Sequence, residues 1–511
     1  MLHKTNKAVF LVLGVSLFAS LVCRPAQACD SHEKAGALDL STATLADLTA
    51  ALEQKKVSSA DLVRGYLERI ANCDSRLHAI IATNPNAMRE AEHLDRERKA
   101  GKLRGPLHGI PIIIKDNIDL AGSVTTAGSL ALASNLRTRN APVVDRLWEA
   151  GIIVIAKANL SEWANIRSGW SSSGWSAVGG LAVNPLNPQR TACGSSSGSG
   201  VAVAARYAPL ALGTETDGSV TCPASVTGLV GLKPTVGLIA GVGIVPISHT
   251  QDTAGPMAVT VRDTAMLLTA MAESPAKGKR VDYSAGLKPG ALKGVRLGVA
   301  RFIKGFSPPT EKSFNAALEL LKAQGAVLVE IDKFDFADLG DLELTILLTE
   351  LKADLNAYLA TTPDTVKTRT LADVIAFNIA EPKEMTWFGQ ELFEQAQATG
   401  GLTDPKYLQA LKKAHDMAGP QGIDRLLREN QVVALVAPTY GPAWTIDLVN
   451  GDHSPASSTQ LPAVAGYPHL TVPMGQVSGL PVGLSFFGAA LSEQTLLSLG
   501  YSFEQAQLAT H

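Results

Sequence analysis

Two glycine-rich loops place serines where acyl-transfer chemistry could occur. The first loop reads CGSSSGSG over residues 193–200, and the second reads GTETDGS over residues 213–219. Glycine lets the backbone turn sharply and expose N–H groups that can stabilise an oxyanion. A serine hydroxyl is a weak nucleophile on its own, so this chemistry also needs a proton acceptor. The candidate acceptor is Lys115, which ends the apolar run IPIIIK at residues 110–115.

Each of these features also has a structural alternative. Lys115 follows three isoleucines, and burial would lower its pKa by up to about 3–5 units, giving a neutral amine that can act as a base. The alternative is a lysine whose ammonium extends to solvent from the end of a strand. Ser195 and Ser196 could cap a helix, and Ser219 could be an ordinary turn residue. The three features together favour a catalytic site.

The segments around the loops alternate between expected strands and helices. The apolar run at 110–114 is rich in β-branched residues, which is typical of a strand buried on both faces. We expect a helix at residues 143–150 followed by a strand at 152–155, and then a helix at 201–207 followed by a strand at 210–212. Another buried strand is expected at 432–436 and a closing helix at 492–505. This alternation predicts an α/β fold with parallel strand pairs.

The N-terminus has the pattern of a secretion signal. Lys4 and Lys7 precede an apolar stretch over 8–22, and Ala-Gln-Ala follows at 26–28. We therefore predict a signal peptide over residues 1–28, a single mature domain over 29–511, and a periplasmic or secreted location. An uncleaved anchor and a lipoprotein attached through Cys29 are the alternatives.

Composition argues against several classes of partner. The 511-residue chain has a formal net charge of −2 and no basic run, so we expect no nucleic-acid partner. No later segment is long and apolar enough to span a bilayer, so no membrane partner is expected after signal cleavage. No histidine pair has metal-ligand spacing, and His249 and His469 are expected to be structural. We predict neither a metal nor an organic cofactor.

The cysteines do not suggest a disulfide scaffold. Four remain after signal cleavage, and none forms a C-x-x-C pair: Cys29, Cys73, Cys193 and Cys222. An oxidising compartment would allow a bridge between Cys29 and Cys73. Cys193 and Cys222 flank the serine loops, but we expect them to be free thiols that pack as small apolar side chains.

These motifs resemble those of the amidase signature family over roughly residues 45–505. The matching segments are GPLHGIP at 105–111, KDN at 115–117, KANLSE at 157–162, the two serine loops, GLVGLKP at 228–234 and QDTAGP at 251–256. Within the family, the chain is similar to bacterial peptide amidases, which remove the C-terminal carboxamide of peptides. The resemblance implies a single large α/β/α domain with a central mixed, mostly parallel sheet.

The resemblance also implies a Ser–cis-Ser–Lys triad. Ser219 aligns with the nucleophile, Ser195 with a bridging serine that follows a cis peptide bond, and Lys115 with the base. Ser196 aligns with a supporting serine, and the N–H groups of four residues align with an oxyanion hole: Thr216, Asp217, Gly218 and Ser219. The implied reaction hydrolyses a carboxamide C–N bond through an acyl-enzyme and releases ammonia.

Four residues are candidates for substrate binding. Thr221 stands where many family members carry an arginine that meets the carboxylate of small acidic amides, and its loss favours neutral peptide amides. Trp163, Asn165 and Trp170 lie in a segment rich in serine and glycine that could form a wall of the substrate cleft. Core packing is the alternative for the tryptophans.

Other functions are kept as alternatives. Residues 194–198 read G-x-S-x-G, the nucleophile elbow of α/β-hydrolase esterases, with Ser196 as the nucleophile. The preceding segment, 184–190, is turn-rich and twice interrupted by proline, which argues against that reading. The family also contains amidases of other small or fatty amides and tRNA-dependent amidotransferase subunits, although a secretion signal argues against the latter. A non-catalytic peptide-binding protein is the last alternative.

Overall fold

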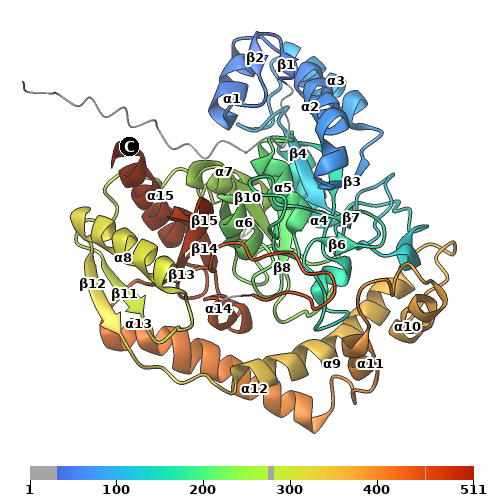
Figure 1. Ribbon diagram of the computed structural model, residues 1–511. Helices are drawn as coiled ribbons and strands as arrows, with labels where there is room; N and C mark the ends of the chain where they lie inside the picture. The colour runs from blue at the N-terminus through green and yellow to red at the C-terminus, as the bar shows by residue number, and fades with distance from the viewer. Residues whose placement is uncertain (1–31, 274–280, 455, 511) are drawn as a thin grey trace, which may run out of the picture.

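The computed structural model describes residues 32–273, 281–454 and 456–510 (Figure 1). The predicted signal peptide and Cys29 lie outside these residues, and so does the pairing considered between Cys29 and Cys73. Among the described residues, no helix has the length and apolar character needed to cross a membrane.

A mixed sheet of eleven strands runs through the centre of this part of the chain (Figure 1). Its strands lie in this order: β12 (Val327–Ile331), β11 (Arg296–Ala300), β13 (Ala434–Pro438), β15 (Leu480–Phe487), β14 (His469–Val477), β9 (Val230–Lys233), β10 (Thr253–Ala258), β8 (Leu210–Glu215), β4 (Pro111–Lys115), β5 (Ile153–Ala158) and β3 (Ile80–Thr83). Two short hairpins lie outside it, β1 (Lys34–Ala35) with β2 (Leu38–Asp39) and β6 (Trp175–Ser176) with β7 (Gly180–Leu181).

The sheet is mixed, as predicted, but it is not mostly parallel. Four of its pairings are parallel, in the groups β12–β11–β13 and β8–β4–β5. The other six are antiparallel. The difference arises because the β14–β15 hairpin, β9 and β10 form an antiparallel run between the two parallel groups.

Helices flank the sheet on both sides (Figure 1). They are α1 (Leu45–Glu53), α2 (Ser59–Cys73), α3 (Ala87–Lys99), α4 (Pro142–Glu149), α5 (Ser197–Ala204), α6 (Thr221–Thr227), α7 (Val261–Met271), α8 (Pro308–Ala323), α14 (Gln460–Val464) and α15 (Glu493–Thr510). The largest apolar core contains residues from Ala35 to Phe503, so both ends of the described chain contribute to one core. This agrees with the single α/β domain expected from the sequence.

A second group of helices forms an arm beside the sheet, drawn in yellow to orange in Figure 1. Its members are α9 (Leu339–Ala360), α10 (Leu371–Ala380), α11 (Glu391–Gln397), α12 (Pro405–Ala418) and α13 (Asp424–Asn430). Helix α9 packs against α12 and α11. Its apolar residues, including Leu351 and Leu355, share a core cluster with Trp163. The arm therefore closes one side of the region that holds the predicted site.

The register of two strands brings the predicted catalytic segments together. Strands β4 and β8 are parallel, with Ile114 opposite Leu212. Because parallel strands end at the same edge of a sheet, Lys115 and the turn after Glu215 emerge side by side. Helix α5 begins at Ser197, four residues before the predicted start, so the first serine loop lies at its N-terminus.

Candidate active site

Lys115 lies at the buried end of β4 and contacts the first serine loop. Its Nζ donates hydrogen bonds to Ser195 Oγ at 2.7 Å, to Thr214 Oγ1 at 2.8 Å and to the Thr214 carbonyl at 3.3 Å. Lys115 is fully buried. Burial lowers its pKa to about 7, although the nearby carboxylates of Asp252 and Glu215 oppose this shift. A substantial fraction of Lys115 is therefore neutral at neutral pH.

The backbone before Ser195 has the geometry that the resemblance implies. The peptide bond between Gly194 and Ser195 is cis. An ideal Cβ built on Gly194 would lie 2.2 Å from Ser161 Oγ, so a larger residue here would displace the Ser161 side chain. The carbonyl of Ser195 accepts a 3.0 Å hydrogen bond from the N–H of Ser161.

Ser196 joins the two serine loops. Its N–H donates to the carbonyl of Ser219 at 3.1 Å. Its hydroxyl donates to the carbonyl of Thr214 and accepts from the N–H of Thr214, both at 3.1 Å. Within the described chain, no strand of the central sheet leads directly into this loop. This arrangement differs from a nucleophile elbow and gives Ser196 a supporting position.

The turn from Thr216 to Ser219 presents backbone donors. In the described part of the chain, the N–H groups of its four residues make no hydrogen bonds. The carboxylate of Glu215 holds the following turn by accepting from the N–H groups of Val220 at 2.7 Å and Thr221 at 2.8 Å. Ser219 is 8% exposed, whereas Ser195 and Lys115 are not exposed, so Ser219 is the serine that a substrate can reach.

Glycine is required inside this turn. Gly218 has φ +79°, and an ideal Cβ there would lie 2.7 Å from the Tyr440 hydroxyl. The preceding Asp217 is half-buried with its Oδ1 shielded from solvent, and desolvation together with the neighbouring Glu343 carboxylate raises its pKa well above the ordinary range. A neutral carboxyl beside the turn avoids repelling an oxyanion that forms there.

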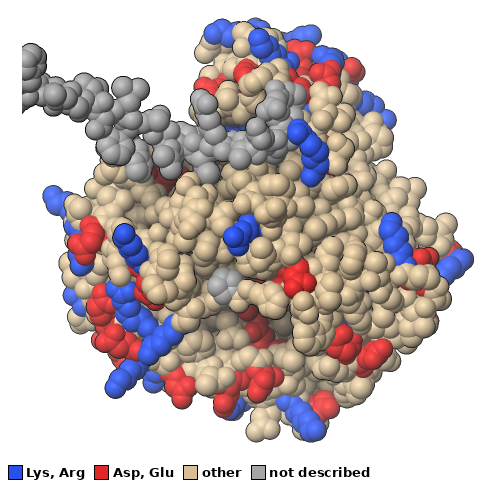
Figure 2. Space-filling model, in the orientation of Figure 1, with Lys and Arg blue, Asp and Glu red and all other residues tan. Residues whose placement is uncertain are grey.

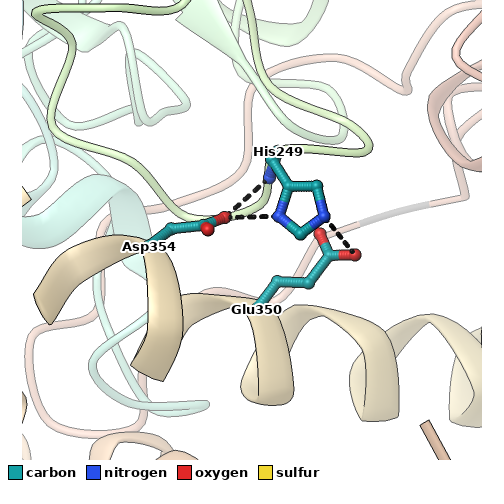
Figure 3. A group of neighbouring side chains, drawn as sticks. All are labelled: His249, Glu350 and Asp354. Carbon is teal, nitrogen blue, oxygen red and sulfur yellow. Dashed lines mark hydrogen bonds and ion pairs between the residues drawn. The ribbon is translucent and has the colours of Figure 1, made fainter. Parts of the chain in front are cut away.

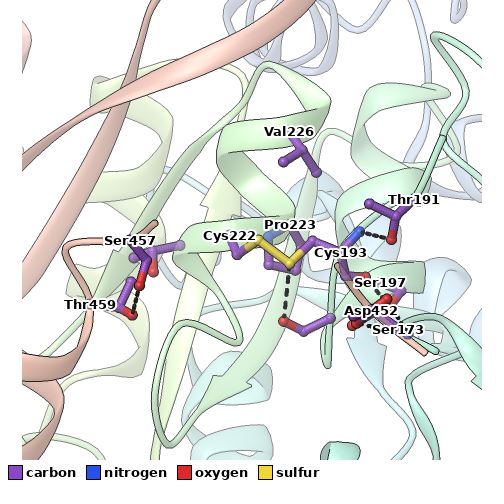
Figure 4. Close-up of a disulfide and its surroundings, with 12 residues drawn as sticks. Ser173, Thr191, Cys193, Ser197, Cys222, Pro223, Val226, Asp452, Ser457 and Thr459 are labelled. Atoms are coloured by element: carbon purple, nitrogen blue, oxygen red, sulfur yellow. Dashed lines mark hydrogen bonds between the residues drawn. A yellow bond between two sulfur atoms is a disulfide. The ribbon is translucent and has the colours of Figure 1, made fainter. Parts of the chain in front are cut away.

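Cys193 and Cys222 form a disulfide, which corrects the expectation of free thiols (Figure 4). Their Cα atoms are 6.0 Å apart. The sequence separates them by 29 residues, but the contact between Ser196 and Ser219 brings their loops together. Both cysteines are buried in a cluster with Trp444. The bridge therefore links the segment that carries Ser195 to the helix that follows Ser219.

A buried ion pair lies next to Lys115. Asp116 and Lys157 have no solvent exposure, and the Lys157 Nζ lies 2.8 Å from Asp116 Oδ1. The Oδ2 of Asp116 accepts a 3.0 Å hydrogen bond from the N–H of Thr126. The second buried lysine of the region is thus paired with a carboxylate, whereas Lys115 is hydrogen-bonded only to neutral oxygens.

A cavity of about 710 Å³ opens beside these groups. Asn117, Thr214 and Thr216 lie on its wall, together with Asp252. Thr216 donates a 2.6 Å hydrogen bond to Asp252 Oδ1, while Asp252 Oδ2 accepts from the N–H groups of residues 247 and 248 at 2.7 and 2.9 Å. Burial raises the pKa of Asp252 to about 6.

The face in Figure 2 is hollowed near its centre, and its acidic and basic side chains are interspersed.

The four predicted substrate-binding residues lie in different environments in the structure. Asn165 lies against the active site, because its Nδ2 would be 3.2 Å from a Cβ on Gly194. Trp163 is buried and packs edge-on against Phe393, in agreement with the core-packing alternative. Trp170 is 62% exposed and does not line the cavity.

Thr221 does not reach the cavity either. It is fully buried, and its hydroxyl lies 3.1 Å from Glu215 Oε2. Its side chain thus helps to fix the turn that follows Ser219. Thr221 is not among the residues that line the cavity.

His249 contacts two acidic residues of α9 (Figure 3). Its Nδ1 lies 2.8 Å from Asp354 Oδ2, and its Nε2 lies 3.6 Å from Glu350 Oε1. The Glu350 carboxylate already accepts hydrogen bonds from Ser248, Thr250 and Tyr407, so it is poorly placed to bind a cation. The cluster ties the loop at 248–250 to α9.

His469 has a structural environment. It is buried, and its Nε2 lies 2.5 Å from the hydroxyl of Ser485. Burial lowers its pKa to about 3, and the charge of Lys233 adds to this shift. The ring is therefore neutral in the folded protein.

Several residues of the site had no assigned role in the sequence. Thr214 and Asn117 contact each other at 3.0 Å, and Thr214 also accepts from Lys115. Asp252 belongs to the QDTAGP motif, and Asn117 belongs to the KDN motif. Both motifs are among the segments that carry the family resemblance, but nothing local to them indicated a role or a partner for Asn117 or Asp252.

The fold and the site define a class of enzyme. A family model described as amidase matches residues 61–497, and the chain belongs to that family. It is a hydrolase that acts on amide C–N bonds.

Individual relatives cover almost the whole chain. The native peptide amidase from Stenotrophomonas maltophilia is 47% identical, with a TM-score of 0.85 over 91% of this chain and 97% of that one. A peptide amidase structure in complex with the competitive inhibitor chymostatin is 47% identical, with a TM-score of 0.87 over 92% and 99% of the two chains. A probable amidase of Arabidopsis thaliana is 37% identical over 496 residues, which cover 91% of this chain and 90% of the relative.

Proposed function

We propose that this enzyme hydrolyses the C-terminal carboxamide of peptides and releases ammonia. The observation that carries the proposal is the hydrogen bond from Lys115 to Ser195, next to a turn whose four N–H groups have no partner in the described chain. The similarity to peptide amidases, one of them with chymostatin bound as a competitive inhibitor, supports a peptide as the substrate.

The reaction begins with proton transfer along the triad. Neutral Lys115 accepts the proton of Ser195, and Ser195 accepts the proton of Ser219 while Ser219 Oγ attacks the amide carbon. The C=O bond becomes a C–O⁻ group that receives hydrogen bonds from the N–H groups of residues 216–219. Protonated Lys115 then returns a proton through Ser195 to the amide nitrogen. The C–N bond breaks and ammonia leaves.

Hydrolysis of the acyl-enzyme reverses the proton path. A water molecule gives a proton toward Ser195 and Lys115 as its oxygen attacks the ester carbon. The second tetrahedral intermediate uses the same N–H groups of residues 216–219. Its collapse returns the proton to Ser219 Oγ and releases the carboxylic acid. Neither serine is consumed, and the triad returns to its starting state.

Two features favour neutral peptide amides over small acidic amides. Thr221 stands where many relatives carry an arginine, and here it is buried against Glu215. The cavity wall also includes Asp252, whose charge above its pKa of about 6 would repel a carboxylate placed near it.

We also propose that the enzyme works in the periplasm or outside the cell. The secretion-signal pattern of residues 1–28 supports this location. The Cys193–Cys222 disulfide supports it too, because disulfides form and persist mainly in oxidising compartments. Fractionation of the source cells, with detection of the mature N-terminus by mass spectrometry, tests the location. Recovery of the full-length chain in the cytosol would contradict it.

Ammonia release from three amides tests the substrate class. We would compare an N-acetyl dipeptide amide, a fatty acid amide and malonamate. The proposal expects kcat/KM to be highest for the peptide amide and lowest for malonamate. A higher value for the fatty amide would assign the enzyme to lipid amides. Folded protein that releases no ammonia from any of them would leave a peptide-binding role.

A further inference from the structure

The cavity beside the triad has a mostly apolar wall. One side is the segment at 236–247, which contributes Val236, Ile239, Ala240, Ile244, Val245 and Ile247. The other side comes from α9 and includes Ala357 and Tyr358. A volume of about 710 Å³ is within the range of about 300–1,000 Å³ that small-molecule sites usually have. The cavity can therefore hold more than the carboxamide itself.

The three carboxylates that line the cavity already have partners, and that of Asp354 is His249. Asp119 pairs with the Nε of Arg137 at 2.8 Å and accepts from the hydroxyl of Tyr358 at 2.8 Å. Asp252 accepts from Thr216 and two backbone N–H groups. Because breaking such buried contacts costs free energy, these groups offer little to a ligand. Apart from Arg139 and Asn140, the surface that remains for a ligand is mainly that of the apolar side chains of residues 236–247.

One buried acceptor on the wall has no partner. Asn117 is 2% exposed and donates from Nδ2 to Thr214 Oγ1 at 3.0 Å. Its Oδ1 makes no hydrogen bond within the described residues and has almost no accessible surface, so a ligand donor reaches it only when the Asn117 side chain shifts toward the cavity. A buried acceptor without a partner is costly unless a ligand supplies a donor. A peptide has such a donor in its backbone N–H, whereas a hydrocarbon chain has none.

The size of the leaving group decides which part of the substrate needs this space. A primary carboxamide releases ammonia, which needs no cavity of this volume. The bulky part of the substrate is its acyl group. The cavity reaches Thr214 in β8 and Thr216, the first residue of the turn that presents the backbone donors.

We propose that the cavity binds the C-terminal residue of the peptide amide, with its apolar side chain against residues 236–247 and its backbone N–H donated to Asn117 Oδ1. This inference rests on the proposed function. The enzyme thus prefers peptide amides that end in a bulky apolar residue, and it distinguishes a peptide from a fatty amide by this N–H group.

Filling the cavity tests the side-chain part of the proposal. Gly241 lines the cavity, and a Cβ built on it meets nothing within 4 Å. We would measure kcat/KM for N-acetylglycinamide, N-acetylleucinamide and N-acetylphenylalaninamide with the wild type and Gly241→Leu. The wild type is expected to favour the two apolar amides by about 10-fold or more. Gly241→Leu is expected to lose about 10-fold on the phenylalanine amide and less than about 3-fold on the glycine amide.

Two further variants accompany Gly241→Leu, one as a control outside the cavity and one as a second way to fill it. Gly105→Leu is the control outside the cavity, because a Cβ on Gly105 meets only the Ala150 carbonyl at an ordinary 3.7 Å. Ala240→Leu, also on the cavity wall, is the second filling variant if Gly241→Leu fails to fold. Equal loss on all three amides, or no loss, would overturn the proposal.

A substrate that lacks the backbone N–H tests the role of Asn117. In the ester analogue of N-acetylleucinamide, oxygen replaces the N–H next to the leucine side chain. The wild type is expected to lose about 10-fold in kcat/KM on this analogue, while Asn117→Ala distinguishes the two substrates by less than about 3-fold. An unchanged ratio in Asn117→Ala would overturn this assignment. Absence of ammonia from every amide would instead reject the proposed function, which separates the two failures.

Discussion

The Nζ of Lys115 lies 2.7 Å from the Oγ of Ser195, and neither side chain is exposed to solvent. Burial makes the charged amine costly, which lowers its pKa to about 7. The hydrogen-bond partners of Lys115 are hydroxyl and carbonyl oxygens of Ser195 and Thr214, not carboxylates. The site therefore favours a lysine that can accept a proton near neutral pH.

The pH profile should show this directly. Only neutral Lys115 can accept a proton, so kcat/KM is expected to rise about tenfold per pH unit below about 7 and to level off above it. The measurement is ammonia release from a neutral peptide amide between pH 5 and 9, with the fold monitored by circular dichroism. A profile that is flat from pH 5 to 8 would contradict a lysine base.

Replacement of Asp252 by asparagine should shift this profile. The negative charge of Asp252 raises the pKa of Lys115, so Asp252→Asn is expected to move the rise in kcat/KM to lower pH. Thr216→Val is the matched control, because it removes the hydrogen bond to Asp252 without changing a charge. A shift to higher pH in Asp252→Asn, or an equal shift in both variants, would refute the electrostatic role.

Two of the buried lysines, Lys115 and Lys157, should respond in opposite ways to replacement by methionine. Lys115→Met is expected to lose nearly all activity without loss of stability, because it removes a buried amine that has no carboxylate partner. Lys157→Met leaves the Asp116 charge buried and unpaired, which is expected to cost roughly 3–5 kcal/mol in the free energy of unfolding. Denaturant unfolding of both variants measures the difference. Equal destabilisation would show that Lys115 has a structural role.

Removal of the disulfide should affect stability and catalysis together. Cys193 and Cys222 lie 29 positions apart in the sequence and close a loop that contains both Ser195 and Ser219. The double variant Cys193→Ala/Cys222→Ala is expected to lose about 3–4 kcal/mol in the free energy of unfolding. Because the bridge joins the loops of the two serines, kcat is expected to fall more than KM rises. Unfolding by denaturant and steady-state kinetics measure the two effects. An unchanged kcat would mean that the hydrogen bond from Ser196 to Ser219 alone holds the loops.

The sequence predicted the parts of the site that depend on local patterns. Lys115 follows an apolar β-branched run, and the serine loops are marked by glycine, so strand burial and sharp turns could be inferred within a few residues. The α/β class followed from alternating patterns in the same way. The antiparallel run depends on the pairing of β9 with β14, which lie more than 200 residues apart in the sequence, and local periodicity does not encode such a pairing.

The remaining contacts arise only in the folded chain. Cys193 and Cys222 meet because two loops pair through Ser196 and Ser219, and their spacing resembles no disulfide motif. Trp170 and Trp163 share one serine- and glycine-rich segment, yet one is exposed and the other packs on α11. Only tertiary packing decides between these environments.

The most direct test of the account is ammonia release from an N-acetyl dipeptide amide by the wild type, Ser219→Ala and Ser196→Ala, with each reaction quenched and analysed by intact-protein mass spectrometry. We expect Ser219→Ala to lose about 10⁴-fold or more in kcat and to form no acyl-enzyme. Ser196→Ala should keep the acyl-enzyme on Ser219 at a reduced rate. Activity retained in Ser219→Ala, together with loss of the acyl-enzyme in Ser196→Ala, would place the nucleophile in the first loop and contradict the proposed triad.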